Sequence, residues 1–261
     1  MIAELYFEAD EDDDGKPALL LLHGALSSRR HWLPNRAALS QHFRIVLAEL
    51  PAHGRSPAPS DPAAYRPEAL VAALDAVREK LGIARWHICG QSFGAGLTLR
   101  YAIMHPGRVI GQVFTNGNVT LRPPFGPEQN TANAERIARL RAFGREELRQ
   151  QKFHPRFAKR FPPDIREILT EDADRIDLEG MIKLLELTLP VLTVRPIFAE
   201  TAVPTLLING RWERGFQPLR DWAAEALPSL RVVDLEGGHS INIEQPEAFN
   251  RAVIDFLLPL A

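Results

Sequence analysis

The sequence predicts an α/β fold whose mostly parallel sheet is covered by helices on both faces. Strand-sized apolar runs alternate with amphipathic helical patterns up to about residue 118 and again after about residue 203. This alternation is typical of parallel strands joined by crossover helices. Residues 18–22 and 44–48 are almost continuously apolar, as strands buried on both faces are. A chain of 261 residues, 45% of them hydrophobic, can bury one large core.

Local signals define the elements in order. Residues 2–9 alternate weakly and predict a first strand, which an acidic turn ending at Gly15 follows. A helix is expected over residues 31–41. The helix over residues 67–81 is strongly indicated, because proline opens it, apolar residues recur at helical spacing and glycine follows it. Further strands are expected from residue 86 and at 109–115, 205–209 and 230–235, and further helices at 97–103, 218–227 and 246–258.

Residues 119–200 interrupt the alternation, because they contain prolines and helical patterns but no convincing strand. The helical patterns lie near residues 131–150, 163–172 and 178–189. We predict that residues 119–200 form a helical cap or lid, inserted after the sixth strand. The core would then comprise residues 1–118 and 201–261.

Charge is segregated within this predicted lid. Residues 136–160 are mainly basic, and residues 164–186 are mainly acidic. Two interpretations remain open. The favoured one is that solvated helix faces pair with each other, and the alternative is that a basic inner face guides an anionic substrate.

Composition argues against several classes of partner. A net charge of −2 provides no long-range attraction to nucleic acid or to an anionic membrane. No run approaches the roughly 18–20 apolar residues of a membrane span, and the first residues do not resemble a signal peptide. The single cysteine, Cys89, rules out an intramolecular disulfide and favours a cytoplasmic location. The eight histidines form no metal-ligand pattern, so neither metal nor cofactor is expected, and the oligomeric state stays open.

The most informative motif is Gly90-Gln91-Ser92-Phe93-Gly94, which lies between an apolar strand and a helical pattern. Glycines allow a sharp strand-to-helix turn, and the turn presents the serine hydroxyl at a helix N-terminus. This arrangement is the nucleophile elbow of serine hydrolases. Ser92 is therefore the candidate nucleophile.

A serine hydroxyl needs a base, and His239 is the best candidate among the eight histidines. It follows a predicted strand and two glycines, and it comes last in the order serine, acid, histidine. The candidate acid is Glu213, just beyond another buried strand, where it would orient the imidazole. Asp234 is the second choice, because it lies within a strand only five residues before His239. The segment at residues 116–118 was considered for the acid, but it offers no carboxylate.

An oxyanion hole requires two fixed N–H donors. One is expected from the backbone of Phe93, directly after the nucleophile. The other is expected from Ala25, in the loop after the third strand. His23 in that loop is expected to support it through hydrogen bonds.

Together these residues resemble the α/β-hydrolase superfamily, in its lid-bearing, serine esterase-like branch. The resemblance covers residues 17–118 and 203–258. It rests on four motifs: His23-Gly24-Ala25, the run from Leu50 to Ser56, the serine elbow, and Gly237-Gly238-His239 followed by Glu244-Gln245-Pro246. It implies an eight-stranded, mostly parallel sheet and a Ser–acid–His triad that works without a cofactor.

Two positions depart from the superfamily pattern, because Glu49 and Glu213 stand where aspartate is usual. The first departure is interpreted as structural. His53 in the neighbouring loop is not expected to act in catalysis. Superfamily members with an aspartate nucleophile, the epoxide hydrolases and haloalkane dehalogenases, are disfavoured by Ser92.

The predicted activity is hydrolysis of a carboxylic ester or thioester of a small to medium molecule. Lactone opening and carbon–carbon bond hydrolysis on the same triad are the alternatives, and the elbow lacks the Ser-Met-Gly-Gly sequence of carbon–carbon hydrolases. A ligand-binding receptor is the alternative outside enzymes. Apolar side chains in the lid could form either a substrate pocket or the core of the lid: Phe143, Phe153, Phe157, Phe161, Leu184, Leu185, Leu187 and Phe198.

Overall fold

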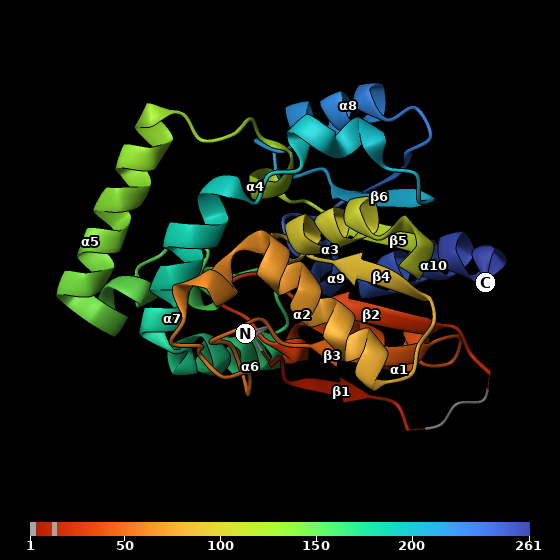
Figure 1. Ribbon diagram of the computed structural model, residues 1–261, viewed down its shortest axis with the longest axis horizontal. Coiled ribbons are helices and arrows are strands. Elements are labelled where there is room, and N and C mark those ends of the chain that lie inside the picture. Colours follow the sequence, from red (N-terminus) through yellow and green to blue (C-terminus); the bar gives the residue numbers. More distant parts are fainter. Residues whose placement is uncertain (1–3, 12–14) are drawn as a thin grey trace.

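The computed structural model describes residues 4–11 and 15–261, which fold around a seven-stranded sheet of order β1-β3-β2-β4-β5-β6-β7 (Figure 1). β1 runs antiparallel to β3, and every other neighbouring pair is parallel. The predicted α/β fold with a mostly parallel sheet is therefore confirmed. The strands are β1 (Phe7–Ala9), β2 (Ala18–Leu22), β3 (Arg44–Ala48), β4 (Trp86–Gly90), β5 (Val109–Thr115), β6 (Thr205–Gly210) and β7 (Arg231–Leu235).

The expectation of an eighth strand is wrong for the described part of the chain, whose sheet has seven strands. The seven strand patterns in the sequence account for all seven strands, and only the resemblance implied another. β1 pairs with β3 alone, so it forms the edge of the sheet. The long helical segment consequently follows the fifth strand, β5, and not the sixth, and Ala25 follows the second strand and not the third. Residues 2 and 3 of the predicted first strand and residues 12–14 of the acidic turn lie outside the described residues.

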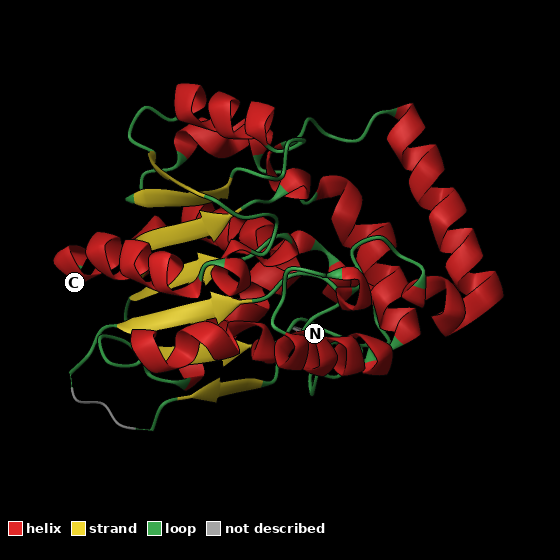
Figure 2. Cartoon of the chain, turned by 180° about the vertical axis from the view of Figure 1, so that it is seen from behind, coloured by secondary structure: helices red, strands yellow, loops and turns green. Residues whose placement is uncertain are grey.

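Helices cover both faces of the sheet, because alternate strand residues face opposite layers. Leu19 and Leu21 of β2 join a cluster with α1 and α10, whereas Leu20 and Leu22 join one with α2 and α3. Figure 1 shows α2 and α3 in front of the sheet, and Figure 2 shows the opposite face, crossed by the C-terminal helix. The core helices are α1 (Leu33–Leu39), α2 (Pro67–Lys80), α3 (Phe93–Met104), α8 (Gln217–Ala226), α9 (Ile241–Glu244) and α10 (Pro246–Leu257).

The chain between β5 and β6, here called the helical segment, lies beyond the carboxyl ends of the parallel strands, toward which their arrowheads point in Figure 2. No strand occurs in it, in agreement with the sequence. A non-helical Gly144, with φ 60° and ψ −136°, breaks its longest helix. Its helices are α4 (Asn118–Leu121), α5 (Pro127–Arg149), α6 (Pro163–Arg175) and α7 (Leu178–Lys183), which continues as a π-helical turn at Leu184–Thr188.

We expect Gly94→Ala to destabilise the protein by about 1–3 kcal/mol, the usual effect of overpacking a close contact. Gly94 lies in the first turn of α3, where a Cβ would come within 2.5 Å of the carbonyl oxygens of Leu22 and His23. Gly107→Ala is the matched control, because nothing lies within 4 Å of a Cβ there. Urea unfolding of both variants measures the effect, and equal midpoints would contradict this account of the strand–helix contact.

Candidate active site

Ser92 lies between β4 and α3 in a strained conformation, with φ 53° and ψ −112°. A residue held there costs roughly 1–3 kcal/mol, and such strain occurs at functional sites. Gly90 allows the approach of strand and helix, since a Cβ there would meet Ala95 Cα at 2.7 Å. Gly96 lies further along α3, where the absence of a side chain leaves room for Leu192 of the helical segment. The structure therefore contains the sharp strand-to-helix turn at Ser92 that the sequence predicts for a nucleophile elbow.

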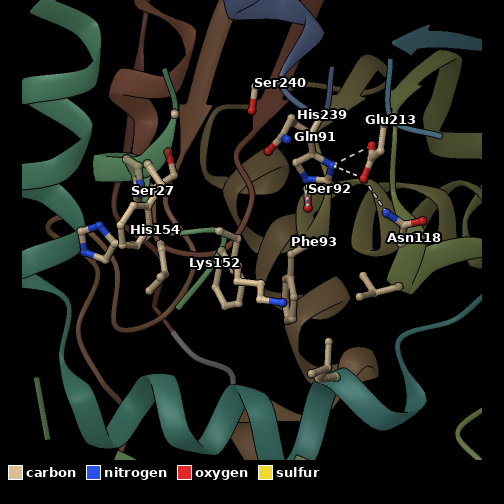
Figure 3. Close-up of a pocket in the computed structure, with 18 of the residues that line it drawn as sticks. Ser27, Gln91, Ser92, Phe93, Asn118, Lys152, His154, Glu213, His239 and Ser240 are labelled. Atoms are coloured by element: carbon tan, nitrogen blue, oxygen red, sulfur yellow. Dashed lines mark hydrogen bonds and ion pairs between the residues drawn. The ribbon is translucent and has the colours of Figure 1, made fainter. Parts of the chain in front are cut away.

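His239 and Ser92 come together although 147 positions separate them in the chain. His239 follows β7, and its Nε2 lies 2.8 Å from Ser92 Oγ. Figure 3 shows the imidazole between the serine and Glu213. Gly210 permits the loops after β6 and β7 to touch, because a Cβ there would lie 2.0 Å from the carbonyl oxygen of Gly238.

Glu213 is the carboxylate that reaches His239. Both of its carboxylate oxygens lie 3.0 Å from His239 Nδ1. An ionised carboxylate only accepts hydrogen bonds, so Nδ1–H donates to Glu213 and Nε2 is free to accept from the Ser92 hydroxyl. Arg211 lies two residues before Glu213 and could have paired with it. It pairs with Glu236 at 2.8 Å instead.

Two asparagines hold Glu213, and the sequence analysis missed their role. Asn116 Nδ2 donates to one carboxylate oxygen at 2.9 Å, and Asn118 Nδ2 donates to the other at 2.6 Å. Asn116 also bonds both the N–H and the carbonyl of Gly210, so it ties the β5 and β6 ends together. Residues 116–118 offer no carboxylate, so the sequence pattern assigns them no part in the acid position. The signal for their actual role was two amides directly after a buried strand.

Hydrogen bonding sets the charge state of Glu213. Burial raises the pKa of this carboxyl, but the hydrogen bonds from His239, Asn116 and Asn118 and the attraction to the imidazole outweigh burial. The net pKa lies below the ordinary value of 4.5, so Glu213 is ionised at neutral pH.

The other candidates for base and acid are engaged elsewhere. His23 accepts from the Leu50 N–H at 3.1 Å and donates to the Gly24 carbonyl, which supports the loop as predicted. His53 accepts from the Leu26 N–H at 3.3 Å. Burial lowers the pKa of His23 to about 4 and that of His53 to about 3, so both rings are neutral at pH 7. Asp234 pairs with Arg220 at 2.9 Å instead of His239.

The loop after β2 packs directly against the serine elbow. A Cβ on Gly24 would lie 3.0 Å from Ser92 Cβ, so glycine is needed for this approach. Ala25 and Phe93 line the same cavity as Ser92. Among the described residues, the backbone N–H groups of both lack a hydrogen-bond partner, which leaves two unpaired donors on residues that line this cavity.

Glu49 has the structural role expected of it. It is fully buried, and it accepts from the backbone N–H of Arg55 at 2.6 Å and from the Arg29 guanidinium at 3.0 Å. Gly54, at φ 55°, leaves the room that this longer carboxylate requires, because a Cβ there would lie 2.1 Å from Glu49 Oε1.

A cavity of about 870 Å³ opens above the serine and is lined by residues of both the core and the helical segment. The apolar side chains of the segment divide between the two roles left open by the sequence. Phe153, Phe157 and Phe161 line the cavity, and Leu185 both lines it and joins a buried cluster. Leu184 and Phe198 belong to buried clusters, Leu187 packs against one, and Phe143 is 66% exposed. Trp212 is half exposed and covers its own loop, where its indole N–H donates to Glu236.

Residues 4–11 and 15–261 contain no cluster of three or more histidine, cysteine or acidic side chains that could hold a metal ion. None of their helices is long and apolar enough to cross a membrane. Cys89 is a packed thiol, since it is buried and burial raises its pKa.

The sheet, the strained serine and the cavity define the class of protein as a hydrolase of the α/β-hydrolase fold. The chain belongs to the alpha/beta hydrolase family, whose model matches residues 19–252.

Relatives within the family differ in the reaction that their names describe. The chain is 28% identical to a putative carbamate hydrolase, RutD, from Pseudomonas savastanoi, over 92% of this chain and 93% of the relative. It is 26% identical to the carboxylesterase YbfK of Bacillus subtilis, over 92% of this chain and 80% of the relative. The crystal structure of an enol-lactonase from Burkholderia xenovorans superposes with a TM-score of 0.82 at 26% identity, covering 97% of this chain and 96% of that one.

The lowered pKa of Glu213 predicts a pH-dependent contribution to stability. A carboxylate with a lowered folded pKa stabilises the fold above its ordinary value of 4.5, and the stabilisation is lost as the pH falls through that value and the folded one. The difference in unfolding free energy between wild type and Glu213→Gln should therefore shrink below that pH. Urea unfolding from pH 7 to pH 4 measures it.

Glu236→Gln serves as the control, because it removes a carboxylate from an exposed ion pair in the same region. Solvent screens such a pair, so its contribution is small at every pH. A Glu213→Gln difference that stays constant over this range would contradict the assignment.

Proposed function

We propose that this protein is a serine hydrolase that cleaves a carboxylic ester or thioester of a small to medium organic molecule. One observation carries the proposal: an unbroken hydrogen-bonded line from Ser92 through His239 to Glu213, with steps of 2.8 and 3.0 Å. Hydroxyl, imidazole and carboxylate in this order are the machinery of acyl transfer. A cavity of about 870 Å³ fits within the roughly 300–1,000 Å³ typical of small-molecule sites.

Acylation would proceed as follows. His239 Nε2 takes the Ser92 proton while Oγ attacks the carbonyl carbon, and the backbone N–H groups of Ala25 and Phe93 donate to the resulting oxyanion. Glu213 stabilises the imidazolium. When the tetrahedral intermediate collapses, His239 returns the proton to the departing alcohol, and the acyl group stays on Ser92.

Deacylation repeats these roles with water. His239 takes a proton from water, the hydroxide oxygen attacks the acyl carbon, and Ser92 leaves with the proton that His239 returns. The products are an acid and an alcohol, or a thiol from a thioester, and the enzyme is restored.

We also propose that residues 119–200 act as a cap over a core of residues 1–118 and 201–261. The cavity is lined from both parts, and Arg160 of the cap pairs with Glu244 of the core at 2.5 Å, beside the His239 loop. A cap in this position would keep bulk water out of the site while the acyl-enzyme forms.

Lactone opening and carbon–carbon bond hydrolysis are the alternative reactions on the same residues. The enol-lactonase likeness favours the first, and the Ser92-Phe93-Gly94-Ala95 elbow disfavours the second. Aryl and alkyl esters of graded length, tested beside lactones, separate these reactions. If the enzyme cleaves only lactones, lactone opening replaces ester hydrolysis as the proposed activity. A binding protein without catalysis would leave Ser92 unlabelled by a fluorophosphonate.

We expect an activated 4-nitrophenyl ester to give a burst of nitrophenol equal to the enzyme concentration, followed by slower turnover. Ser92→Ala should lose about 10⁶-fold in kcat, because no other hydroxyl replaces the nucleophile. Ser229→Ala removes an exposed loop hydroxyl and should behave as the wild type. Hydrolysis by Ser92→Ala at the parent rate would exclude this mechanism.

Glu213→Gln should lower kcat by about 10⁴-fold, because an amide no longer fixes the tautomer or stabilises the imidazolium. Asp234→Asn is the matched control for the rejected acid and should retain most of the activity. Steady-state kinetics of both variants decides between the two carboxylates, and the reverse result would move the acid to residue 234.

A further inference from the structure

The cavity above Ser92 is lined by more cations than anions. Its charged side chains from the helical segment are all basic: Arg122, Arg136, Lys152, Lys159 and Arg160. Its two carboxylates, Glu213 and Glu244, lie on the core side of the cavity. Figure 3 shows Lys152 near the centre of this cavity view, together with Ser92 and Phe93.

Both carboxylates are already engaged. Glu213 accepts hydrogen bonds from His239, Asn116 and Asn118. Glu244 accepts from Arg160 at 2.5 Å and from the Gly238 N–H at 2.8 Å. Within the described residues, the other four cations of the cavity form no ion pair, so their charge is uncompensated.

Outside the cavity, two basic side chains of the same segment form ion pairs with its acidic half. Arg141 pairs with Glu186 at 3.1 Å, and Arg149 pairs with Asp174 at 2.8 Å. The pairing of basic and acidic halves favoured from the sequence is therefore correct for the outer surface. The cavity side carries the unpaired basic face that the sequence left as the alternative.

Arg136 and Arg122 are partly buried, so each loses hydration without gaining an acidic partner. Arg136 Nε is buried and has no hydrogen-bond partner among the described residues. Each guanidinium lies over an aromatic ring, Arg136 at 5.0 Å from Phe153 and Arg122 at 3.8 Å from Phe125. Stacking engages one face of a guanidinium and leaves in-plane N–H groups available for an oxyanion. Arg122 uses one of them, because its Nη2 donates to the Leu189 carbonyl at 3.4 Å.

Both guanidinium groups remain charged at neutral pH. Burial lowers the pKa of each to about 10, well above 7. Arg122 directly follows α4, whose first residue, Asn118, contacts Glu213. Four helical residues span about 6 Å, so the backbone of Arg122 lies close to the serine site.

We propose that Arg122 and Arg136, assisted by Lys152, bind a carboxylate on the substrate, so that the preferred ester carries a second, anionic group. This inference rests on the proposed ester hydrolysis for its location at the active site. Arginine forks bind carboxylates in a bidentate, charge-assisted manner, which neither water nor a neutral acyl chain reproduces.

The test compares two esters that differ only at the far end of the acyl chain. Mono-(4-nitrophenyl) adipate ends in a carboxylate where 4-nitrophenyl hexanoate ends in a methyl group. We expect the wild type to prefer the adipate ester by at least 10-fold in kcat/KM. Arg136→Gln and Arg122→Gln should each lose about 10- to 100-fold on the adipate ester, mainly through KM, and less than threefold on the hexanoate.

Arg141→Gln is the matched control, because it removes an exposed, paired arginine from α5, the helix that carries Arg136. It should leave both esters unchanged. Added salt should raise KM for the adipate ester and not for the hexanoate. Arg136→Gln should also melt at the same or a higher temperature than the wild type, whereas a merely structural arginine would lower it. A wild type without preference for the adipate ester, or equal losses on both esters, would overturn the proposal.

Calorimetric titration with free adipate keeps the anion site separate from the proposed hydrolysis. If neither ester is cleaved and Ser92 is not labelled, the hydrolase proposal fails. The anion site still stands in that case if adipate binds the wild type and does not bind Arg136→Gln. Absence of adipate binding to the wild type overturns the anion site, whatever the hydrolysis assays give. Inorganic phosphate is titrated alongside. If phosphate binds more tightly than adipate, the proposed carboxylate on the substrate is wrong, and a phosphoryl group takes its place in the assignment.

Discussion

The site depends on the parallel register of the central strands. Leu22 of β2 pairs with Gly90 of β4, Gly90 pairs with Phe114 of β5, and Gly210 of β6 pairs with Leu235 of β7. The carboxyl ends of five strands therefore meet at one edge of the sheet, where α/β folds place their ligands. Loops after these strands carry every group in the proposed mechanism, so a change of register would separate nucleophile, base and acid together.

The glutamate in the acid position is accommodated by its surroundings. Two asparagines from the end of β5 and the start of α4 hold its carboxylate, and each donates to one of its two oxygens. Asn116 also bonds both backbone groups of Gly210, so the orientation of Glu213 is coupled to the β5–β6 pairing. A buried carboxylate without such donors would be driven toward its neutral form. The asparagines thus belong to the same hydrogen-bonded unit as the proposed triad, although they carry no charge.

In the two proposals made for it, the helical segment combines closure of the site with selection of the substrate. The same stretch supplies aromatic walls, such as Phe153 and Phe157, and the unpaired cations of the cavity. Unpaired, partly dehydrated arginines weaken a fold that contains no ligand, and a bound anion relieves this penalty. Stability and substrate preference are therefore linked in this segment, whereas the core beneath it is apolar and closely packed.

Local signals in the chain were enough to predict most of the fold and to single out the groups of the proposed mechanism. Glycine spacing around Ser92, apolar runs before Glu213 and His239, and proline at the start of α2 all act between near neighbours, so one sequence reveals them. The eighth strand had no such local pattern in its favour, and it proved wrong. The roles of Asn116 and Asn118 were missed because an amide becomes a partner for a carboxylate only through contact across two strands.

The sequence by itself therefore determined which residues follow which strand, and thus the candidates for the elbow, the base and the acid. Only the tertiary structure decided which side chains of the helical segment face the cavity, with Phe153 and Arg136 turned inward while Phe143 and Arg141 lie outside. The physical reason is that helix periodicity fixes relative faces along one helix, whereas packing against other helices decides which face meets solvent and which meets substrate.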